Sequence, residues 1–198
     1  MKAVILGAGR MGSVIAYAMN KLNFSVVAID TSKPALEALS DKVDSLRSWS
    51  SEVVTLHVRD LGKQLEGILK KQQPDIVISS LPYFVNSLAA SIVIRNNLRY
   101  CDLGGRIDVS AEINAHAKKS AKVPVFTDLG LAPGWVNILA EQGYKRVYDA
   151  TDVQMMVGGI PRKRPKGPLK YFMTWSLDGL LNEYRDCLLY TSPSPRDA

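Results

Sequence analysis

Cysteine, histidine and long apolar runs are all scarce in this sequence. Its two cysteines, Cys101 and Cys187, provide neither a disulfide framework nor the ligand spacing of a metal site. The two histidines, His57 and His116, are expected to be structural or solvated. No apolar run approaches the ~20 residues that a membrane span needs, and Gly7 interrupts the N-terminal run before a signal peptide could form. These absences argue against a disulfide-stapled secreted domain, a metal centre and a membrane protein, and they predict a cytoplasmic protein.

The net charge of +6 comes largely from one segment of the chain. The stretch GIPRKRPKGPLK at 159–170 contains five of the 25 basic residues and no acidic one, so the remainder nearly balances the 19 acidic residues. Its prolines and glycines predict a solvated connection, and no aromatic side chains interleave the basic ones as in many nucleic-acid-binding surfaces. We therefore expect no nucleic-acid partner. A substrate carboxylate or phosphate near Arg162, Lys163 or Arg164 stays open.

Strand and helix patterns alternate from the first residue. Six short apolar runs predict buried strands at 2–9, 24–30, 52–58, 74–81, 99–105 and 123–130. Helical spacing of apolar residues predicts helices at 11–22, 32–46, 61–69, 86–96 and 110–121. Because each connection is long enough for a crossover helix, the pattern predicts an α/β domain with a doubly wound parallel sheet over residues 1–145.

The strongest functional signal is GAGRMG, which lies directly between the first strand and the first helix. Gly7 permits a tight turn, Gly9 lets the backbone approach a pyrophosphate, and Gly12 lets helix and strand pack closely. Arg10 and Met11, inside the same motif, open the helix whose N-terminal amides face the phosphates. The context predicts a dinucleotide-binding Rossmann domain.

Two aspartates belong to the same prediction. Asp30 ends the second strand 18 residues after Gly12, where its carboxylate can accept hydrogen bonds from both ribose hydroxyls and repel a 2′-phosphate. This favours NAD as cofactor, although Thr31, Ser32 and Lys33 leave NADP open. Asp60 is expected to cap its helix or to contact adenine.

The first thirty residues also resemble the nucleotide-sensing domains that regulate potassium transporters, which bind NAD or ATP without chemistry. The later motifs favour a different family. SSLPYFVNS, YCDLGG, DLGLAPGWVN and VGGIPRKRPKGPLKYFMTWSLDGLLNEY together resemble the saccharopine dehydrogenase family, in particular its lysine 6-dehydrogenase-like branch. The resemblance covers residues 1 to about 186. It implies NAD(P)-dependent oxidation of an amino acid's C–N bond to an imine, or the reverse condensation, and a homodimer.

The resemblance also assigns roles to residues at the strand ends. It implies that Ser80, Leu81 and Pro82 flank the nicotinamide side of the cofactor, as do Gly130 and Leu131. A nicotinamide enzyme leaves the redox step to its cofactor and supplies orientation and proton handling from the protein.

Substrate contacts are implied for another set of positions. Asp102 and Leu103 match the segment that meets substrate, and Asp102 followed by Asp128 are the candidates for proton handling, with a loop or helix-cap role open for each. Two positions depart from the saccharopine-forming pattern. Ala132 replaces an aspartate before Pro-Gly, and Asp178 replaces an arginine after Trp-Ser. A carboxylate in place of an arginine suits a cationic amine, which favours lysine or a related diamino acid as substrate.

Beyond residue 145 the pattern changes. Residues 149–159 alternate like a half-exposed antiparallel strand, and the resemblance implies that 146–186 begin an α+β domain for substrate binding and dimerisation. Residues 187–198, CLLYTSPSPRDA, have no periodicity, and their codons can be written as a sequencing adaptor read through in frame. We therefore expect 187–198 to be a non-native tail and the reading frame to be truncated near residue 186. Such a chain would bind dinucleotide weakly and catalyse nothing.

Overall fold

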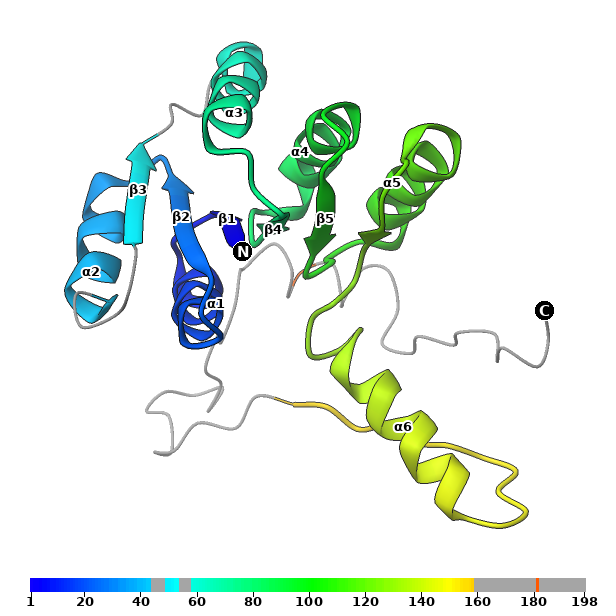
Figure 1. Cartoon of the computed structure of the whole chain (residues 1–198). Helices are drawn as coiled ribbons and strands as arrows, with labels where there is room; N and C mark the ends of the chain where they lie inside the picture. The colour runs from blue at the N-terminus through cyan, green and yellow to red at the C-terminus, as the bar shows by residue number, and fades with distance from the viewer. Residues whose placement is uncertain (44–48, 54–57, 159–180, 182–198) are drawn as a thin grey trace. The chain divides into compact units, whose positions relative to one another are not determined.

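The computed structural model describes residues 1–43, 49–53, 58–158 and 181 (Figure 1). The chain divides into two compact units, Met1–Val153 and Gln154–Ala198. The first unit contains the sheet and the helices described below. Most of the segment expected to begin a second domain, and the whole expected tail at 187–198, lie outside the described residues, so both remain predictions.

Strands and helices alternate along the first unit. The strands are β1 (Lys2–Leu6), β2 (Ser25–Asp30), β3 (Trp49–Val53), β4 (Ile76–Ser79), β5 (Arg99–Asp102) and β6 (Val125–Phe126). The helices are α1 (Arg10–Lys21), α2 (Lys33–Val43), α3 (Val58–Gln72), α4 (Tyr83–Arg95), α5 (Ile107–Ser120) and α6 (Trp135–Arg146).

The six strands form one parallel sheet in the order β3-β2-β1-β4-β5-β6 (Figure 1). The chain moves outward from β1 through β2 to β3 and then returns to add β4 on the other side of β1. This is the predicted doubly wound parallel sheet, which is confirmed. Sheets of this kind bind ligands outside the carboxyl ends of their strands where the strand order reverses. In this chain that point lies between β1 and β4.

Alternate residues of the central strands contribute to two separate cores, one on each face of the sheet. Val4 and Leu6 of β1 pack with residues of α3, α4 and α5, whereas Ala3 and Ile5 pack with residues of α1 and α2. Because both faces are covered by helices, the inner positions of β1, β2 and β4 are apolar on both faces, and this continuous apolar run is what predicted these strands from the sequence. The cores hold the carboxyl ends of β1, β4 and β5 at one edge of the sheet.

The two edge strands differ from the prediction. β3 covers Trp49–Val53 and pairs with β2, with Trp49 opposite Val26. The predicted range 52–58 is therefore wrong at its start and at Val58, which begins α3, while residues 54–57 lie outside the described part of the chain. β6 is only two residues long, and the residues after Phe126 form a loop. Edge strands commonly carry polar and charged residues, as β3 does with Ser50, Ser51 and Glu52, so the apolar pattern is a weaker guide there.

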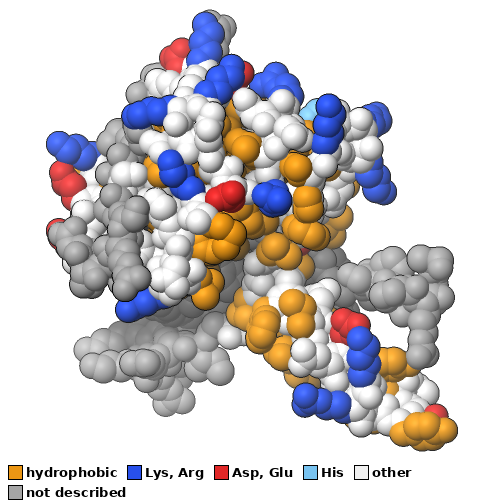
Figure 2. Space-filling view, in the orientation of Figure 1, with side chains coloured by type: hydrophobic (Ala, Val, Ile, Leu, Met, Phe, Trp, Pro, Cys, Tyr) orange, Lys and Arg blue, Asp and Glu red, His pale blue; other side chains and the backbone are white. Residues whose placement is uncertain are grey.

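Helix α6 follows that loop and is absent from the predicted elements. None of its described residues is buried, and Trp135, Ile138 and Leu139 remain about half exposed, at 53, 47 and 49%. Figure 2 shows apolar side chains gathered along this helix. Residues 151–158 have no regular secondary structure, so the strand predicted at 149–159 is not formed over them. Among the described residues, no helix has the length and apolar character needed to cross a membrane.

Candidate dinucleotide site

The glycine motif forms the turn between β1 and α1, and two of its glycines are required by packing. Gly7 has a φ of 92°, and its amide donates to the carbonyl oxygen of Ile29 at 2.8 Å. A Cβ on Gly7 would lie 3.0 Å from the carbonyl oxygen of Ser80. A Cβ on Gly12 would overlap the carbonyl oxygen of Gly7 and lie 2.8 Å from its carbonyl carbon. No side chain fits at either position without a backbone shift.

Gly9 is different, because no contact among the described residues requires a glycine there. Its φ of −67° and ψ of −163° are extended values that other residues adopt, and a Cβ built on it meets no atom within 4 Å. The open space lies where Gly9 becomes the N-cap of α1, a helix of 12 residues with no acidic residue in its first turn. A helix N-terminus attracts phosphate through its unpaired amides and its dipole. The motif therefore fits the close approach of a pyrophosphate.

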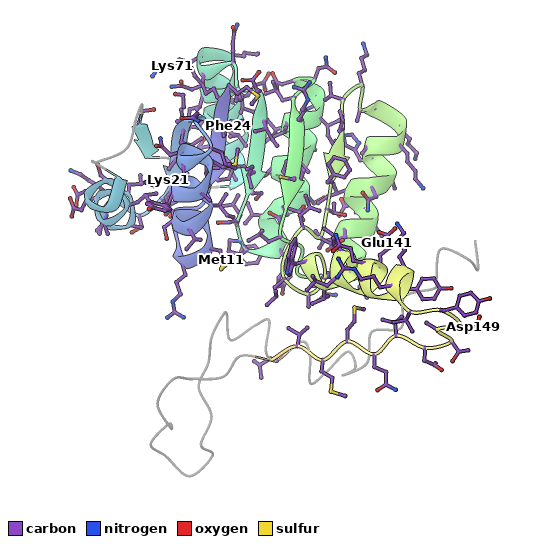
Figure 3. The ribbon with its side chains drawn as sticks, turned by 60° about the horizontal axis from the view of Figure 1, so that its bottom comes forward. Met11, Lys21, Phe24, Lys71, Glu141 and Asp149 are labelled. Atoms are coloured by element: carbon purple, nitrogen blue, oxygen red, sulfur yellow. The ribbon has the colours of Figure 1, made fainter. Side chains whose placement is uncertain are left out.

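Arg10 and Met11 form the first turn of α1 beside that space. Arg10 is exposed, and the Met11 side chain is 57% exposed. Figure 3 shows Met11 at one end of α1, with Phe24 and Lys71 toward the opposite edge of the sheet. The two motif residues thus lie at the carboxyl edge, where the site was predicted.

Asp30 ends β2 and is tied to the glycine turn. Its Oδ2 accepts a hydrogen bond from the amide of Ala8 at 2.6 Å, and its Oδ1 accepts one from the amide of Ser32 at 2.7 Å. The Ser32 hydroxyl in turn accepts a bond from the amide of Ala35 at 3.3 Å, in the first turn of α2. The carboxylate that was predicted to meet the ribose is therefore fixed in position by the backbone on both sides.

The residues after β4 contact the glycine turn from the other side of β1. The Ser80 amide donates to Leu6 at 2.8 Å, and its hydroxyl donates to the carbonyl oxygen of Gly7 at 3.3 Å. Leu81 is half-buried and packs against the core, and Pro82 is exposed as the residue before α4. Ser80 is thus the member of this predicted group that touches the glycine turn.

Asp102 ends β5 and is 1% exposed. Its Oδ1 accepts hydrogen bonds from the amides of Gly104 at 2.8 Å and Asp128 at 3.1 Å. Its Oδ2 is buried without a hydrogen-bond partner among the described residues, and the buried Tyr100 hydroxyl lies nearby without hydrogen-bonding geometry. Burial raises the pKa of the Asp102 carboxyl, against the two amides, which lower it. The carboxylate faces the protein interior.

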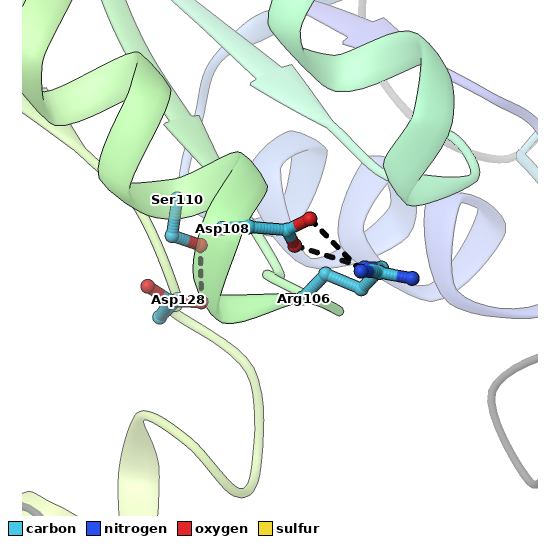
Figure 4. A network of polar contacts seen from close by, with 4 residues as sticks. All are labelled: Arg106, Asp108, Ser110 and Asp128. Carbon is cyan, nitrogen blue, oxygen red and sulfur yellow. Dashed lines mark hydrogen bonds and ion pairs between the residues drawn. The ribbon is translucent and has the colours of Figure 1, made fainter. Parts of the chain in front are cut away.

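Asp128 follows β6 and has a φ of 61°, a left-handed conformation that aspartate tolerates better than most residues. Its Oδ1 accepts a hydrogen bond from the Ser110 hydroxyl at 2.8 Å (Figure 4). The Asp128 side chain also lies against Gly104, whose φ is 77°. Both aspartates that were predicted for proton handling therefore make contacts within the loops that follow β5 and β6.

The loop after β6 folds back on itself before α6 begins. Gly130 forms a bridge with Gly134, and the Trp135 amide donates to the Gly130 carbonyl oxygen at 2.9 Å. A Cβ on Gly130 would lie 2.8 Å from the carbonyl oxygen of Leu103, so the two loops touch there. Leu131, at the tip, is 61% exposed. The structure thus brings together Leu103 and Gly130, which were assigned to the substrate and the nicotinamide.

The sequence itself connects this geometry with known proteins. The profile of the saccharopine dehydrogenase NADP-binding domain matches residues 3–125, which include the glycine turn, Asp30 and the ends of β4 and β5. This chain belongs to that family. The predicted family and a nicotinamide dinucleotide cofactor are thereby confirmed. The match contains the glycine motif, Asp30 and Ser80–Pro82, whereas Gly130 and Leu131 lie beyond it.

Solved structures show the same fold at low identity. Saccharopine dehydrogenase (L-Glu forming) from Saccharomyces cerevisiae is 19% identical, with a TM-score of 0.55 over 73% of this chain and 31% of that chain. The WlbA dehydrogenase from Chromobacterium violaceum, solved with NADH and UDP-GlcNAcA, is 17% identical, with a TM-score of 0.50 over 72% and 40%. The NAD(P)-binding domain of an exopolyphosphatase-related protein from Archaeoglobus fulgidus is 13% identical, with a TM-score of 0.52 over 73% and 98%. The chain spans about a third of the yeast protein.

One feature of this saccharopine dehydrogenase-type domain lacks a clear sequence signal. The Arg106 guanidinium lies 5.7 Å from the centroid of the Tyr83 ring, and Tyr83 packs against Gly105, whose Cβ would meet it at 3.0 Å. Asp108 binds Arg106 through both oxygens, at 2.8 and 2.9 Å (Figure 4). That guanidinium lowers the pKa of the Asp108 carboxyl. The positive charge of Arg106 and the negative charge of Asp108 therefore neutralise each other beside the loop that contains Leu103.

The remaining predicted site residues are not brought together. Asp60 is exposed in the first turn of α3, a position that suits a carboxylate at a helix N-terminus. Asp178 and the basic residues Arg162, Lys163 and Arg164 lie outside the part of the chain that the structure describes. Ser110, which binds Asp128, escapes sequence reasoning because a serine in the first turn of a helix is ordinary.

Proposed function

We propose that this chain is the cofactor-binding part of an NAD(P)-dependent oxidoreductase that acts on the C–N bond of an amino acid, lysine or a related diamino acid. The observation that carries the proposal is the open space at Gly9, at the N-terminus of α1, in a chain of the saccharopine dehydrogenase type. Gly7 and Gly12 have packing reasons to be glycine, whereas Gly9 has a reason only if a ligand approaches its backbone.

Each part of the site has a task in this proposal. The amides of the first turn of α1 hold the pyrophosphate, and Asp30 accepts the ribose hydroxyls. The cofactor, when bound, accepts or donates the hydride. The two loops that meet at Leu103 and Gly130 orient the substrate carbon, because they border the same edge of the sheet. Asp128 and Asp178 are proposed to face the substrate or its proton, whereas the carboxylate of Asp102, the first residue considered for that task, is buried.

The substrate class rests on the two positions that depart from the saccharopine-forming pattern. Ala132 and Asp178 change the local charge in opposite ways, since one removes an aspartate and the other replaces an arginine. A free cationic amine matches the second change better than the dicarboxylate arm of saccharopine does. Family resemblance further supports a homodimer of the whole protein.

We expect NAD to be preferred over NADP. The Asp30 carboxylate is held by the amides of Ala8 and Ser32, so it cannot swing away from a 2′-phosphate without breaking both bonds. Repulsion between two fixed negative charges then disfavours NADP. The matched domain of the family is an NADP-binding domain, so this member would differ from it in cofactor preference.

A second function deserves a test, because the matched domain from Archaeoglobus fulgidus is aligned over nearly its whole length. A Rossmann domain can stand alone as a sensor that binds NAD or ATP without chemistry. The resemblance of the first thirty residues to potassium-transporter regulators points the same way. Binding of ATP in place of a nicotinamide dinucleotide would favour this function.

The deciding experiment titrates NADH, NADPH and ATP separately against the chain by fluorescence, with Asp30→Ser as the variant. Asp75→Ser is the matched control, since Asp75 also accepts a backbone amide, from Lys2 at 2.7 Å. We expect NADH to bind more tightly than NADPH, and only Asp30→Ser to reduce that preference. Binding of ATP alone would overturn the enzymatic proposal. For the longer protein, the absorbance of reduced nicotinamide formed from lysine and NAD tests the substrate.

A further inference from the structure

We propose that Asp102 is a positioning residue, which holds the loops after β5 and β6 together as one platform beside the nicotinamide end of the cofactor site. This rests on the proposed function, because the platform matters for cofactor binding only if a dinucleotide occupies the crevice. The platform is defined here as Leu103–Gly105 and Thr127–Gly134.

Asp102 joins the two loops by accepting three hydrogen bonds. The Asp102 Oδ1 accepts from the Gly104 amide of the first loop at 2.8 Å and from the Asp128 amide of the second loop at 3.1 Å. Its backbone carbonyl oxygen accepts from the Leu129 amide at 2.8 Å. A carboxylate that accepts backbone amides makes stronger bonds than a neutral acceptor does. Asp102 therefore fixes both loops relative to β5.

Close backbone contacts leave the two loops no freedom to slide. The Asp128 side chain occupies the space where Gly104 would carry a Cβ, and the carbonyl oxygen of Leu103 lies where Gly130 would carry one. The Ser110 hydroxyl holds the Asp128 carboxylate from α5 at 2.8 Å. Closely packed protein contacts allow little displacement without a cost. The platform thus depends on the buried carboxylate at its base.

The platform lies one strand away from the glycine turn. Asp102 is opposite Ser79 in the register of β4 and β5, and the next residue, Ser80, bonds Gly7. The Ser79 hydroxyl donates to Asn86 Oδ1 at 2.7 Å in a buried contact that anchors this end of β4 to α4. Because β4 lies between β1 and β5, a displacement of the platform would reach the glycine turn on the side away from Asp30.

Burial argues against the alternative in which Asp102 itself transfers a proton to substrate. The side chain is 1% exposed, and one of its oxygens already accepts two amides. A proton-transfer group must come within hydrogen-bond reach of the substrate. Part of the platform is exposed, at Gly105, Leu129 and Leu131–Pro133, with Leu131 at 61%. Asp102 acts through them.

The test compares Asp102→Ala, Asp102→Asn and the control Asp75→Ala in the full chain. Asparagine keeps an oxygen that can accept both amides, whereas alanine keeps none. The readouts are amide hydrogen exchange at Gly104 and Asp128, with the amides of β1 as an internal reference for folding, and the affinities for NADH and ADP-ribose. ADP-ribose occupies the glycine turn and the ribose site but has no nicotinamide.

In Asp102→Ala, we expect the amides of Gly104 and Asp128 to exchange about tenfold faster than in the wild type, equivalent to ~1.4 kcal/mol. The exchange rates of the β1 amides should be unchanged. We also expect it to bind NADH several-fold more weakly while ADP-ribose affinity stays within twofold. Asp102→Asn should restore both, and Asp75→Ala should resemble the wild type. Equal weakening of both ligands by Asp102→Ala, or failure of Asp102→Asn to restore NADH binding, would overturn the proposal.

A failure of the proposed function can be distinguished from a failure of the Asp102 proposal. If the wild-type chain binds neither NADH nor ADP-ribose, the dinucleotide site is refuted and with it the role of the platform in cofactor binding. Amide hydrogen exchange then tests only whether Asp102 holds the two loops together. Unchanged rates at Gly104 and Asp128 in Asp102→Ala would overturn that role, and faster rates would support it.

Discussion

Gly12 packs so closely on Gly7 that a Cβ on Gly12 would overlap the Gly7 carbonyl oxygen and lie 2.6 Å from the Ser80 hydroxyl oxygen. Gly9, between them, has nothing within 4 Å of its Cβ position. The glycines of one motif therefore have different reasons to be glycine. Gly7 and Gly12 allow the chain to pack at the turn between β1 and α1, whereas Gly9 has no packing reason among the described residues and is proposed to admit the cofactor.

The first prediction separates these reasons. Gly12→Ala should lower the free energy of unfolding by ~2–3 kcal/mol, because the added methyl group overpacks a backbone contact. Gly9→Ala should leave the thermal midpoint nearly unchanged but weaken NADH binding about tenfold, equivalent to ~1.4 kcal/mol. Thermal denaturation and fluorescence titration measure the two effects. A Gly9→Ala variant with wild-type affinity would contradict a ligand at this turn.

The second prediction concerns the pH dependence of stability at Asp102. Burial raises its pKa above the ordinary value of 3.8, the Asp128 carboxylate adds to the rise, and the Gly104 and Asp128 amides oppose it. Tyr100 and Cys101 are the other titratable groups at this end of β5. The native state then binds the proton more tightly than the unfolded state. The contribution of Asp102 to stability is therefore present in acid and is lost as the pH rises from the ordinary pKa of 3.8 through the raised pKa of the folded state.

Asp102→Asn removes this dependence. Urea denaturation at a series of pH values should show the difference in unfolding free energy, wild type minus Asp102→Asn, largest in acid and decreasing towards neutral pH. Comparison of the two chains cancels the titration of groups common to both. A difference that increases with pH would mean that the folded-state pKa is lowered, and that the two amides outweigh burial.

The third prediction is the inertness of Cys101. Burial, followed by the nearby Asp102 charge, raises the pKa of its thiol to about 11, and a thiol reacts through its thiolate. In a Cys187→Ser variant, Cys101 should react with a disulfide reagent at least a hundredfold more slowly in the native state than in denaturant, on the order expected for a group that needs unfolding to ionise. Comparable rates in the two states would place Cys101 outside the core.

A fourth prediction uses two glycines at α6. Gly134 has a φ of 126°, and its Cβ would lie 2.7 Å from the Gly130 nitrogen, so Gly134→Ala should disrupt the start of the helix. Gly143 lies within the helix with nothing near its Cβ position, so Gly143→Ala should stabilise α6 by ~0.5–1 kcal/mol. Amide exchange along Trp135–Arg146 reports both changes. Faster exchange in Gly143→Ala would show that the helix is not as described.

The central part of the fold was predictable because burial on both faces makes the interior of a strand apolar on both faces. The runs of β1, β2 and β4 have this pattern, whereas β5 has only Tyr100 and Cys101 between Arg99 and Asp102. The glycine turn followed from its place after the first run. β3 lacks this pattern, because an edge strand such as Trp49–Val53 tolerates polar residues. Helix α6 has no buried residue, so its apolar pattern is short and ends after Leu139.

The site was predictable only as far as chain order determines it. Strand ends located Gly9, Asp30 and Ser80 at one edge, because parallel strands bring their carboxyl ends together. The side-chain directions of Asp102 and Asp128 depend on two loops that pack against each other. Contacts between segments that are distant in the chain produce no recognisable residue pattern in the sequence. Their bonds to backbone amides and to Ser110 became visible only in three dimensions.

The hydrogen bond from the Ala8 amide to Asp30 also constrains how cofactor preference could be redesigned. A substitution that removes the carboxylate to admit a 2′-phosphate also removes the acceptor that holds the glycine turn through the Ala8 amide. Such a substitution would trade affinity for selectivity, and a compensating change near Ala8 would have to accompany it. Mutations at the two positions should therefore be strongly epistatic, and a switch of cofactor in this lineage would have few single-step routes.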